Sequence, residues 1–239
     1  MKLKKIAIVA AMEQEGQAIC PAPRHERIGK FPILAGTNKD NVSYRCIVSG
    51  IGIARAAEAA KLLCAEKPDL ILSIGVSGGL AAGLEAGALV AATSIHSDIA
   101  EFDSWFEGND DARLRSELIP SCGEIQCGKL ITANEAVLTP QDKLFMHERT
   151  GALAVDMESI AVAQTAQKAG IPFGCIRAIS DDSKRGIPQE SLAGVDESGK
   201  TQLGPILKAI MKRPSLIFEL IPMGRDYSKA LKGLEKILK

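Results

Sequence analysis

Short, uninterrupted apolar runs alternate with helical segments along most of this chain. Residues 6–11, 70–74 and 173–179 each predict a fully buried strand, because apolar runs of this length fit a strand covered on both faces. Residues 153–179 form a predicted strand–helix–strand unit, whose helix stops at Gly170-Ile171-Pro172. This alternation predicts an α/β fold: a single domain with a central mixed, mostly parallel sheet flanked by helices.

The bulk composition is that of an ordinary globular protein, and it narrows the range of functions. The 239 residues suit one large domain better than two small ones, and 46% of them are hydrophobic. Lys+Arg and Asp+Glu both number 29, so the net charge of zero argues against nonspecific binding to nucleic acid. Aromatic residues make up 4%, which leaves few platforms for stacking single-stranded bases. We therefore expect no nucleic-acid partner.

The cysteines and histidines show no spacing typical of a metal site, and we predict no metal ion. The six cysteines form no C-x-x-C pair, and several lie in apolar stretches, as Cys46 and Cys175 do. We expect buried, reduced thiols in a cytoplasmic protein. The first apolar run meets Glu13 too early for a signal peptide, and no stretch is long enough to span a bilayer.

The chain changes character after about residue 183. Residues 183–202 are rich in Ser, Gly, Asp and Lys and predict an exposed loop, and three later prolines, ending with Pro222, should break the remainder into short helices. We therefore expect an α/β domain over residues 1–183, and a loop with a C-terminal helical extension of the same domain over residues 184–239. The basic and apolar residues of this extension fit either packing, including a homodimer contact, or peripheral contact with a membrane.

Carboxylates follow the buried strands at the points where those strands end. Asp156 and Glu158 lie at the start of a predicted helix, and Asp181 lies at the end of the strand that follows it. Glu15 comes after the first strand, on a segment expected to be a loop, and a later strand runs into a glycine-rich turn, residues 75–79. Ligands of α/β sheets bind at the carboxyl ends of strands, so these side chains should converge. Converging carboxylates suit acid–base chemistry on a sugar or a base.

Four segments at these strand ends, in this order, resemble those of the purine nucleoside phosphorylase and nucleosidase superfamily. They are residues 10–15, 75–79, 154–159 and 176–182. The resemblance covers about residues 4–183 and is greatest to the methylthioadenosine/S-adenosylhomocysteine nucleosidase-like branch. It implies the nucleoside phosphorylase-like fold, and an enzyme that cleaves the N-glycosidic bond of a purine nucleoside.

A more particular resemblance is to the hopanoid-associated phosphorylases. It is carried by residues 143–159, 195–199 and 211–214. Those proteins are thought to remove adenine from adenosylhopane, a nucleoside whose 5′ carbon carries a large triterpene. The small residues Ala136 and Val137 fit a pocket with room for such a group. This resemblance implies a role in hopanoid biosynthesis, with methylthioadenosine/S-adenosylhomocysteine nucleosidase as the alternative.

The resemblance also implies a role for each carboxylate. Asp181 matches the general acid that protonates purine N7, and partial burial would help it to hold that proton near neutral pH. Glu158 matches the residue that binds the ribose hydroxyls, where its charge stabilises an oxocarbenium-like transition state, and Met157 would pack on the sugar. Glu15 matches the base that activates water. The other candidates for the substrate site are Asp156, Arg177, Ser180, Val76, Ser77 and Gly78, with Arg177 and Ser180 expected to orient the Asp181 loop.

Two departures from the superfamily pattern bear on the nucleophile. Val76 stands where the family often has a small hydroxyl residue, and the loop typical of the phosphorylases is missing after the first strand, where Glu15 lies instead. These departures favour water over phosphate, although phosphate stays a candidate co-substrate. We expect no other cofactor.

Other interpretations of these residues stay open at the level of sequence. Gly50-Ile51-Gly52 could begin a dinucleotide-binding turn of an oxidoreductase, but Arg55 stands where that fingerprint needs its third glycine. A nucleoside-binding module without catalysis is another alternative. Taken singly, Glu158 could be a helix-terminal acid, and Asp181 and Asp182 could be ordinary turn residues.

Overall fold

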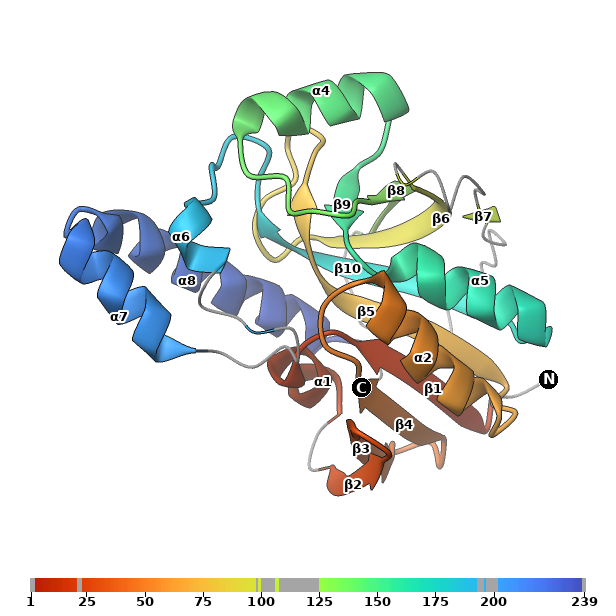
Figure 1. The fold of residues 1–239 in the computed structure, drawn as a ribbon. Helices are drawn as coiled ribbons and strands as arrows, with labels where there is room; N and C mark the ends of the chain where they lie inside the picture. The colour runs from red at the N-terminus through yellow and green to blue at the C-terminus, as the bar shows by residue number, and fades with distance from the viewer. Residues whose placement is uncertain are drawn as a thin grey trace.

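A mixed sheet with helices on both faces forms the scaffold of the protein (Figure 1). The computed structural model describes residues 3–20, 23–97, 99, 106–107, 125–192, 196 and 202–237. The described strands are Lys5–Ala10 (β1), Arg24–Ile28 (β2), Phe31–Thr37 (β3), Ser43–Val48 (β4), Leu70–Gly79 (β5), Leu89–Ser97 (β6), Phe106–Glu107 (β7), Gln126–Thr132 (β8), Ala154–Asp156 (β9) and Phe173–Asp181 (β10). The described helices are Glu13–Ile19 (α1), Ile53–Cys64 (α2), Pro140–Thr150 (α4), Ser159–Ala169 (α5), Gln189–Leu192 (α6), Leu203–Lys212 (α7) and Leu216–Leu234 (α8). The predicted α/β fold is confirmed.

Five strands close into a ring at the centre of the molecule. β5 pairs in parallel with β10, β10 pairs antiparallel with β6, and β6 pairs in parallel with β8. β8 then pairs in parallel with β9, and β9 returns to β5 through antiparallel pairs at Gly78 and Gly79. β1, β4, β3 and β2 extend the sheet from the other side of β5. The ring therefore places the last residues of β5 and β10 beside β9.

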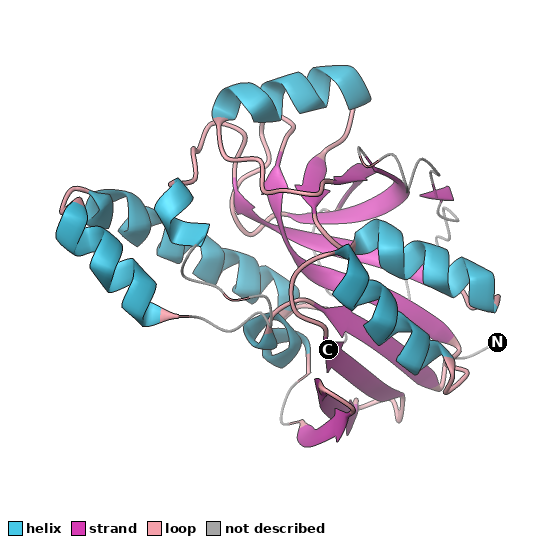
Figure 2. Cartoon of the chain, viewed as in Figure 1, coloured by secondary structure: helices cyan, strands magenta, loops and turns pink. Residues whose placement is uncertain are grey.

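Two apolar clusters cover the two faces of the sheet. α2 and α5 lie side by side on one face, where Leu63 and Val162 are fully buried (Figure 2). α1 and α8 pack on the other face, where Ile19 and Leu234 join the second cluster. The strands between them are covered on both sides, which explains their uninterrupted apolar sequences.

Three segments that carry site residues differ from the predictions. Residues 75–79 continue β5 instead of forming a turn, because they pair with β10 and β9. Residues 13–19 form α1 instead of a loop, so Glu15 lies in the first turn of a helix. Helix α5 begins at Ser159, so Asp156 ends β9 and Glu158 is the residue that caps the helix.

The C-terminal extension is helical, as expected, but it has fewer breaks than its prolines predict. α8 continues through Pro222, and burial of Ala230 and Leu234 against the sheet offsets the hydrogen bond that a proline removes. Of the expected loop, residues 193–195 and 197–201 lie outside the described residues, and so does most of the 195–199 segment. Within the part of the chain that the structure describes, each helix is too short or too polar to cross a bilayer.

The packing of α8 on the sheet predicts the effect of two glycine substitutions in that helix. A Cβ on Gly233 would lie 2.7 Å from the carbonyl oxygen of Gly87, whereas a Cβ on Gly224 would meet nothing within 4 Å. We expect Gly233→Ala to lower the free energy of unfolding by about 1–3 kcal/mol. Gly224→Ala, the control, should leave it unchanged or raise it by up to about 1 kcal/mol. Urea denaturation measures both, and equal stabilities would contradict the close packing of α8.

Candidate active site

One cavity of about 230 Å³ gathers the expected carboxylates at the ends of β5, β9 and β10. Of the expected site residues, those that line it are Glu15, Val76, Ser77, Gly78, Asp156, Met157, Glu158, Ser180 and Asp181. Arg177 lies beneath it, beside Glu15 and Glu158. Lining residues that the sequence did not single out for the site include Ala11, Met12, Ile51, Glu135, Val155 and Ile187. The structure therefore brings segments from both halves of the chain to one site.

Glu15 is held by two backbone amides in the floor of the cavity. The N–H of Met12 donates to its Oε2 and the N–H of Val76 donates to its Oε1, each at 2.8 Å. Burial raises the pKa of the Glu15 carboxyl above its ordinary value, although these two hydrogen bonds oppose the shift. A carboxyl group with a raised pKa, fixed in a cavity, suits a general base.

Glu158 occupies the N-cap position of α5, but its side chain makes no capping hydrogen bond to that helix. Its Oε1 accepts a hydrogen bond of 2.8 Å from the N–H of Gly52, at the start of α2. Burial, followed by the neighbouring charge of Asp156, raises the pKa of Glu158 to about 7. The surroundings of Glu158 thus oppose the charge that the resemblance expects of this carboxyl.

The contact between Glu158 and Gly52 also bears on the dinucleotide alternative. Gly50 and Gly52 have φ angles of 80° and 98°, as a tight turn before a helix requires. The anion at the N-terminus of α2 is the protein's own Glu158 carboxylate. Arg55 bonds the carbonyl oxygen of Ser49 at 2.8 Å and lies over the ring of Phe31. This turn is thus occupied by protein groups at the point where a pyrophosphate would bind.

Arg177 pairs with Asp156, and the prediction that it orients the Asp181 loop is wrong. Its Nε lies 2.7 Å and its Nη2 2.6 Å from Oδ2 of Asp156, and Nη2 also donates to the hydroxyls of Ser73 and Ser159, each at 2.8 Å. Both charged side chains are buried. Burial opposes the charge of Arg177, yet the groups around it, Asp156 among them, raise its pKa. The pair forms a rigid support beneath the cavity.

Asp181 is buried at the end of β10 and is bonded on both carboxyl oxygens. Ser180 Oγ donates to Oδ1 at 2.6 Å, and the ammonium of Lys143 contacts Oδ2. Ser180 thus contacts Asp181, and the cation beside this carboxyl is Lys143 in place of the expected Arg177. The burial expected of the family's acid is accompanied by a charged partner.

The glycines of β5 make room for these carboxylates. A Cβ on Gly75 would lie 2.8 Å from Oε1 of Glu15, and a Cβ on Gly78 would lie 3.3 Å from Oδ2 of Asp181. The glycine-rich segment is thus a strand that lets two acidic side chains approach its backbone, and the predicted glycine-rich turn is wrong. Between them, Ser77 has a buried hydroxyl that bonds no described residue, so it is available to a ligand.

Lys143 is the most important site residue that the sequence reasoning missed. It lies on α4, whose start does carry a signal: Thr139 accepts a hydrogen bond from the N–H of Asp142, and Pro140 is the first helical residue. The helix could therefore have been predicted. The burial of its lysine could not, because that depends on the distant residues of β10.

Comparison with known proteins agrees with this arrangement. The model of the phosphorylase superfamily matches residues 5–212. The chain belongs to this superfamily. A methylthioadenosine/S-adenosylhomocysteine nucleosidase of Haemophilus influenzae is 31% identical over 210 residues, covering 78% of this chain and 90% of the relative. One of Lysinibacillus sphaericus is 29% identical, covering 86% and 98%.

Solved structures of the superfamily show the same fold. The nucleosidase of Neisseria meningitidis in complex with methylthio-immucillin-A matches with a TM-score of 0.70 and 22% identity, covering 98% of each chain. The S-adenosylhomocysteine nucleosidase of Streptococcus pyogenes, in complex with a methylthio-nucleoside analogue, matches with a TM-score of 0.71 and 19% identity, covering 99% of this chain and 96% of the other. The likeness extends through the C-terminal helices.

The raised pKa of Glu158 predicts how stability depends on pH. Between pH 4.5 and about 7 the folded protein binds more protons at Glu158 than the unfolded chain does, so this group's contribution to stability is lost as the pH rises. Glu158→Gln removes the titration and keeps an acceptor for Gly52. We expect the stability of the variant relative to wild type to increase by on the order of 2–3 kcal/mol from pH 5 to pH 8. Parallel curves of unfolding free energy against pH would contradict the shift.

The ion pair beneath the cavity predicts a large loss of stability. Asp156→Asn leaves the Arg177 guanidinium buried without its counter-charge, which should cost about 3–5 kcal/mol. Thermal and urea denaturation measure the loss. Asp40→Asn, at an exposed position, is the control and should change stability by less than about 0.5 kcal/mol. An equally small change for Asp156→Asn would show that the pair is not a support.

Proposed function

We propose that this chain hydrolyses the N-glycosidic bond of 5′-substituted adenosines, with methylthioadenosine and S-adenosylhomocysteine as substrates. The coarser activity follows from its family and relatives: the chain is an enzyme that cleaves N-glycosyl bonds of purine nucleosides. The observation that carries the proposal is the convergence of Glu15, Glu158 and Asp181 on one cavity. The identity of the substrates is proposed from the nucleosidases to which the chain is similar.

Each carboxylate has a different task in this proposal. As the bond from C1′ to N9 breaks, the base takes the electron pair and N7 receives a proton through Asp181. Glu158 binds the ribose hydroxyls and, when ionised, stabilises the positive charge of the sugar. Glu15 takes a proton from the water that attacks C1′. Met157 lines the same cavity and packs on the sugar.

Water is favoured over phosphate as the nucleophile because the described lining of the cavity offers no cation to a phosphate anion. Its described lining contains five acidic residues (Glu15, Glu135, Asp156, Glu158 and Asp181), and no lysine or arginine. The cations around it are engaged: Lys143 by Asp181, Arg177 by Asp156 and Arg55 by Ser49. A phosphate bound here would lack the cation that enzymes use to hold it.

The test is the release of adenine from methylthioadenosine in phosphate-free buffer. Wild-type protein should release adenine and free methylthioribose, with no increase in rate and no sugar 1-phosphate when phosphate is added. A requirement for phosphate would contradict hydrolysis, and no release of adenine from any 5′-substituted adenosine would contradict the activity.

The roles of the carboxylates predict the behaviour of two variants. Asp181→Asn and Glu15→Gln should each lower kcat about 100-fold or more, because each removes a proton-transfer group. Glu13→Gln is the matched control for Glu15, since Glu13 lies in the same helical turn but bonds to Gln17, outside the cavity. It should keep wild-type kcat. Variants of Glu15 and Asp181 with full activity would remove those residues from the chemistry.

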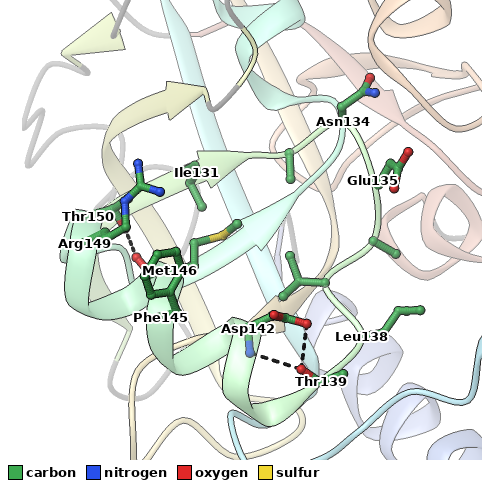
Figure 3. A pocket seen from close by; sticks show the side chains of 13 residues that line it. Ile131, Asn134, Glu135, Leu138, Thr139, Asp142, Phe145, Met146, Arg149 and Thr150 are labelled. Atoms are coloured by element: carbon green, nitrogen blue, oxygen red, sulfur yellow. Dashed lines mark hydrogen bonds between the residues drawn. The ribbon is translucent and has the colours of Figure 1, made fainter.

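Adenosylhopane is a second candidate substrate, favoured by a larger cavity beside the first. This second cavity has a volume of about 620 Å³ and shares Glu135, Ala136 and Val137 with the site. Figure 3 shows its two walls, one from α4 with Phe145 and the other from β8 and the segment that follows it. Much of this lining is apolar, as a large hydrocarbon substituent at the 5′ carbon would require.

The exposed face of the C-terminal helices is consistent with that candidate. Large apolar side chains are exposed there: Leu207, Met211, Ile217, Phe218 and Ile221. They would suit a peripheral membrane contact or a homodimer contact, and both stay predictions. The ratio of kcat/KM for adenosylhopane to that for methylthioadenosine decides between the substrates. If the lipid nucleoside is the substrate, Ala136→Phe should lower kcat/KM for adenosylhopane much more than for methylthioadenosine.

A further inference from the structure

The side chain of Lys143 is fully buried and points to the acid end of the cavity. Its ammonium contacts Oδ2 of Asp181 and donates to the carbonyl oxygens of Asp182 at 2.8 Å and Arg185 at 2.9 Å. The exposed fraction of Lys143 is 0%. Its three N–H groups thus meet three acceptors, which is the condition for burying an ammonium. Lysine is among the residues least often buried, so its position here requires a reason.

The contact gives the acid end of the cavity a second proton-bearing group. The ammonium of Lys143 and the hydroxyl of Ser180 both donate to the carboxyl of Asp181. Purine N7 must receive a proton, and the ammonium lies one residue further from the substrate than the carboxyl that would deliver that proton.

We propose that Lys143 is a positioning residue that supplies the proton of Asp181, so that the two side chains act as one acid. The proposal rests on the proposed nucleosidase activity. As the bond from C1′ to N9 breaks, N7 takes a proton from Asp181 while Asp181 takes one from the Lys143 ammonium. Asp181 ends as a carboxylate and Lys143 as a neutral amine. Water adds to C1′ and gives its proton to Glu15, and that proton returns through solvent to Lys143, so the cycle has no net proton change.

The charged groups around the pair are engaged elsewhere or face the substrate. The guanidinium of Arg185 pairs with Asp226 at 2.8 Å, and Oδ1 of Asp182 accepts the N–H of Lys184 at 2.9 Å. On α4, Asp142 bonds Thr139. Glu15, Glu135 and Glu158 line the cavity, whereas the described hydrogen bonds of the Lys143 ammonium go to Asp181, Asp182 and Arg185. Asp181 is therefore the carboxylate with which Lys143 pairs.

Lys143 also fixes the turn after β10. Its bonds to the carbonyl oxygens of residues 182 and 185 hold the start of the segment that carries Ile187 into the cavity lining, and the N–H of Ile187 donates to the carbonyl oxygen of Leu138. Loss of Lys143 should therefore affect folding as well as chemistry. The test must separate the two effects.

The pH dependence of methylthioadenosine cleavage separates them. We compare the wild type with Lys143→Met, which removes the charge, Lys143→Arg, which keeps a charge that cannot be given up, and Lys168→Met, an exposed control. For Lys143→Met we expect kcat at pH 8 to fall about 100-fold or more, with much of it recovered at acid pH, where solvent can supply the proton in place of the ammonium. The alkaline limb of its pH profile should move down by at least about one pH unit, whereas KM changes little. Lys143→Arg should fold and bind substrate but stay slow throughout.

Two results would overturn the proposal. One is a Lys143→Met variant that loses thermal stability but keeps the wild-type kcat and pH profile, which is the outcome for a purely structural lysine. The other, decisive if Lys143→Met does not fold, is a Lys143→Arg variant with the wild-type kcat and profile. Turnover by the wild-type protein in the same assay distinguishes a failure of the proposed function from a failure of the role of Lys143. Absence of wild-type turnover contradicts the proposed function, whereas full wild-type turnover with an unchanged variant profile contradicts only the role of Lys143.

Discussion

The pairing of β5 with β10 is the constraint on which the site depends. Its register places Gly75 beside Arg177 and Gly78 beside Asp181. Each glycine leaves space that a side chain would fill, and Glu15 and Asp181 occupy it. A shift of one residue would turn every side chain of β10 to the opposite face of the sheet, so the site and the apolar core fix the same register.

The same pairing explains why so many charges can be buried together. Arg177 enters from β10 and neutralises Asp156 beneath the cavity, and Lys143 enters from α4 and neutralises Asp181 at its edge. Among the described residues, Glu15 and Glu158 accept hydrogen bonds from backbone amides, and for both of them burial raises the pKa. Carboxyl groups with and without an ion-pair partner thus lie in one cavity.

The sequence predicted the parts of this structure that depend on local pattern. The predicted buried strands at residues 6–11, 70–74 and 173–179 are mostly apolar in sequence, and Gly170, where the helix was predicted to stop, has the left-handed conformation that glycine favours. The convergence of Glu15, Glu158 and Asp181 followed from the rule that ligands bind at strand ends, and from a resemblance to a known family.

What the sequence did not predict depends on contacts between distant residues. Arg177 lies four residues before Asp181, yet it pairs with Asp156 at the end of β9. Strand alternation would place residues 177 and 181 on the same face, but the register of β10 shifts between Ile179 and Asp181. The glycines of residues 75–79 predicted a turn because glycine is common in turns. In the structure these glycines lie in a strand, where they let side chains approach the backbone closely. Lys143 lies 38 positions from its partner Asp181 in the sequence, and no periodicity marks it as buried.

The proposed function requires that Asp181 contacts the base, Glu158 the sugar and Glu15 the attacking water when a 5′-substituted adenosine is bound in one cavity. The most direct measurement is a crystal structure of the wild-type protein with a methylthioadenosine analogue whose glycosidic bond cannot be cleaved. We expect the purine five-membered ring beside Asp181, the ribose hydroxyls within about 3 Å of Glu158, and a water molecule between Glu15 and C1′. A nucleoside bound elsewhere, or bound with its base at Glu15 and its sugar at Asp181, would contradict it.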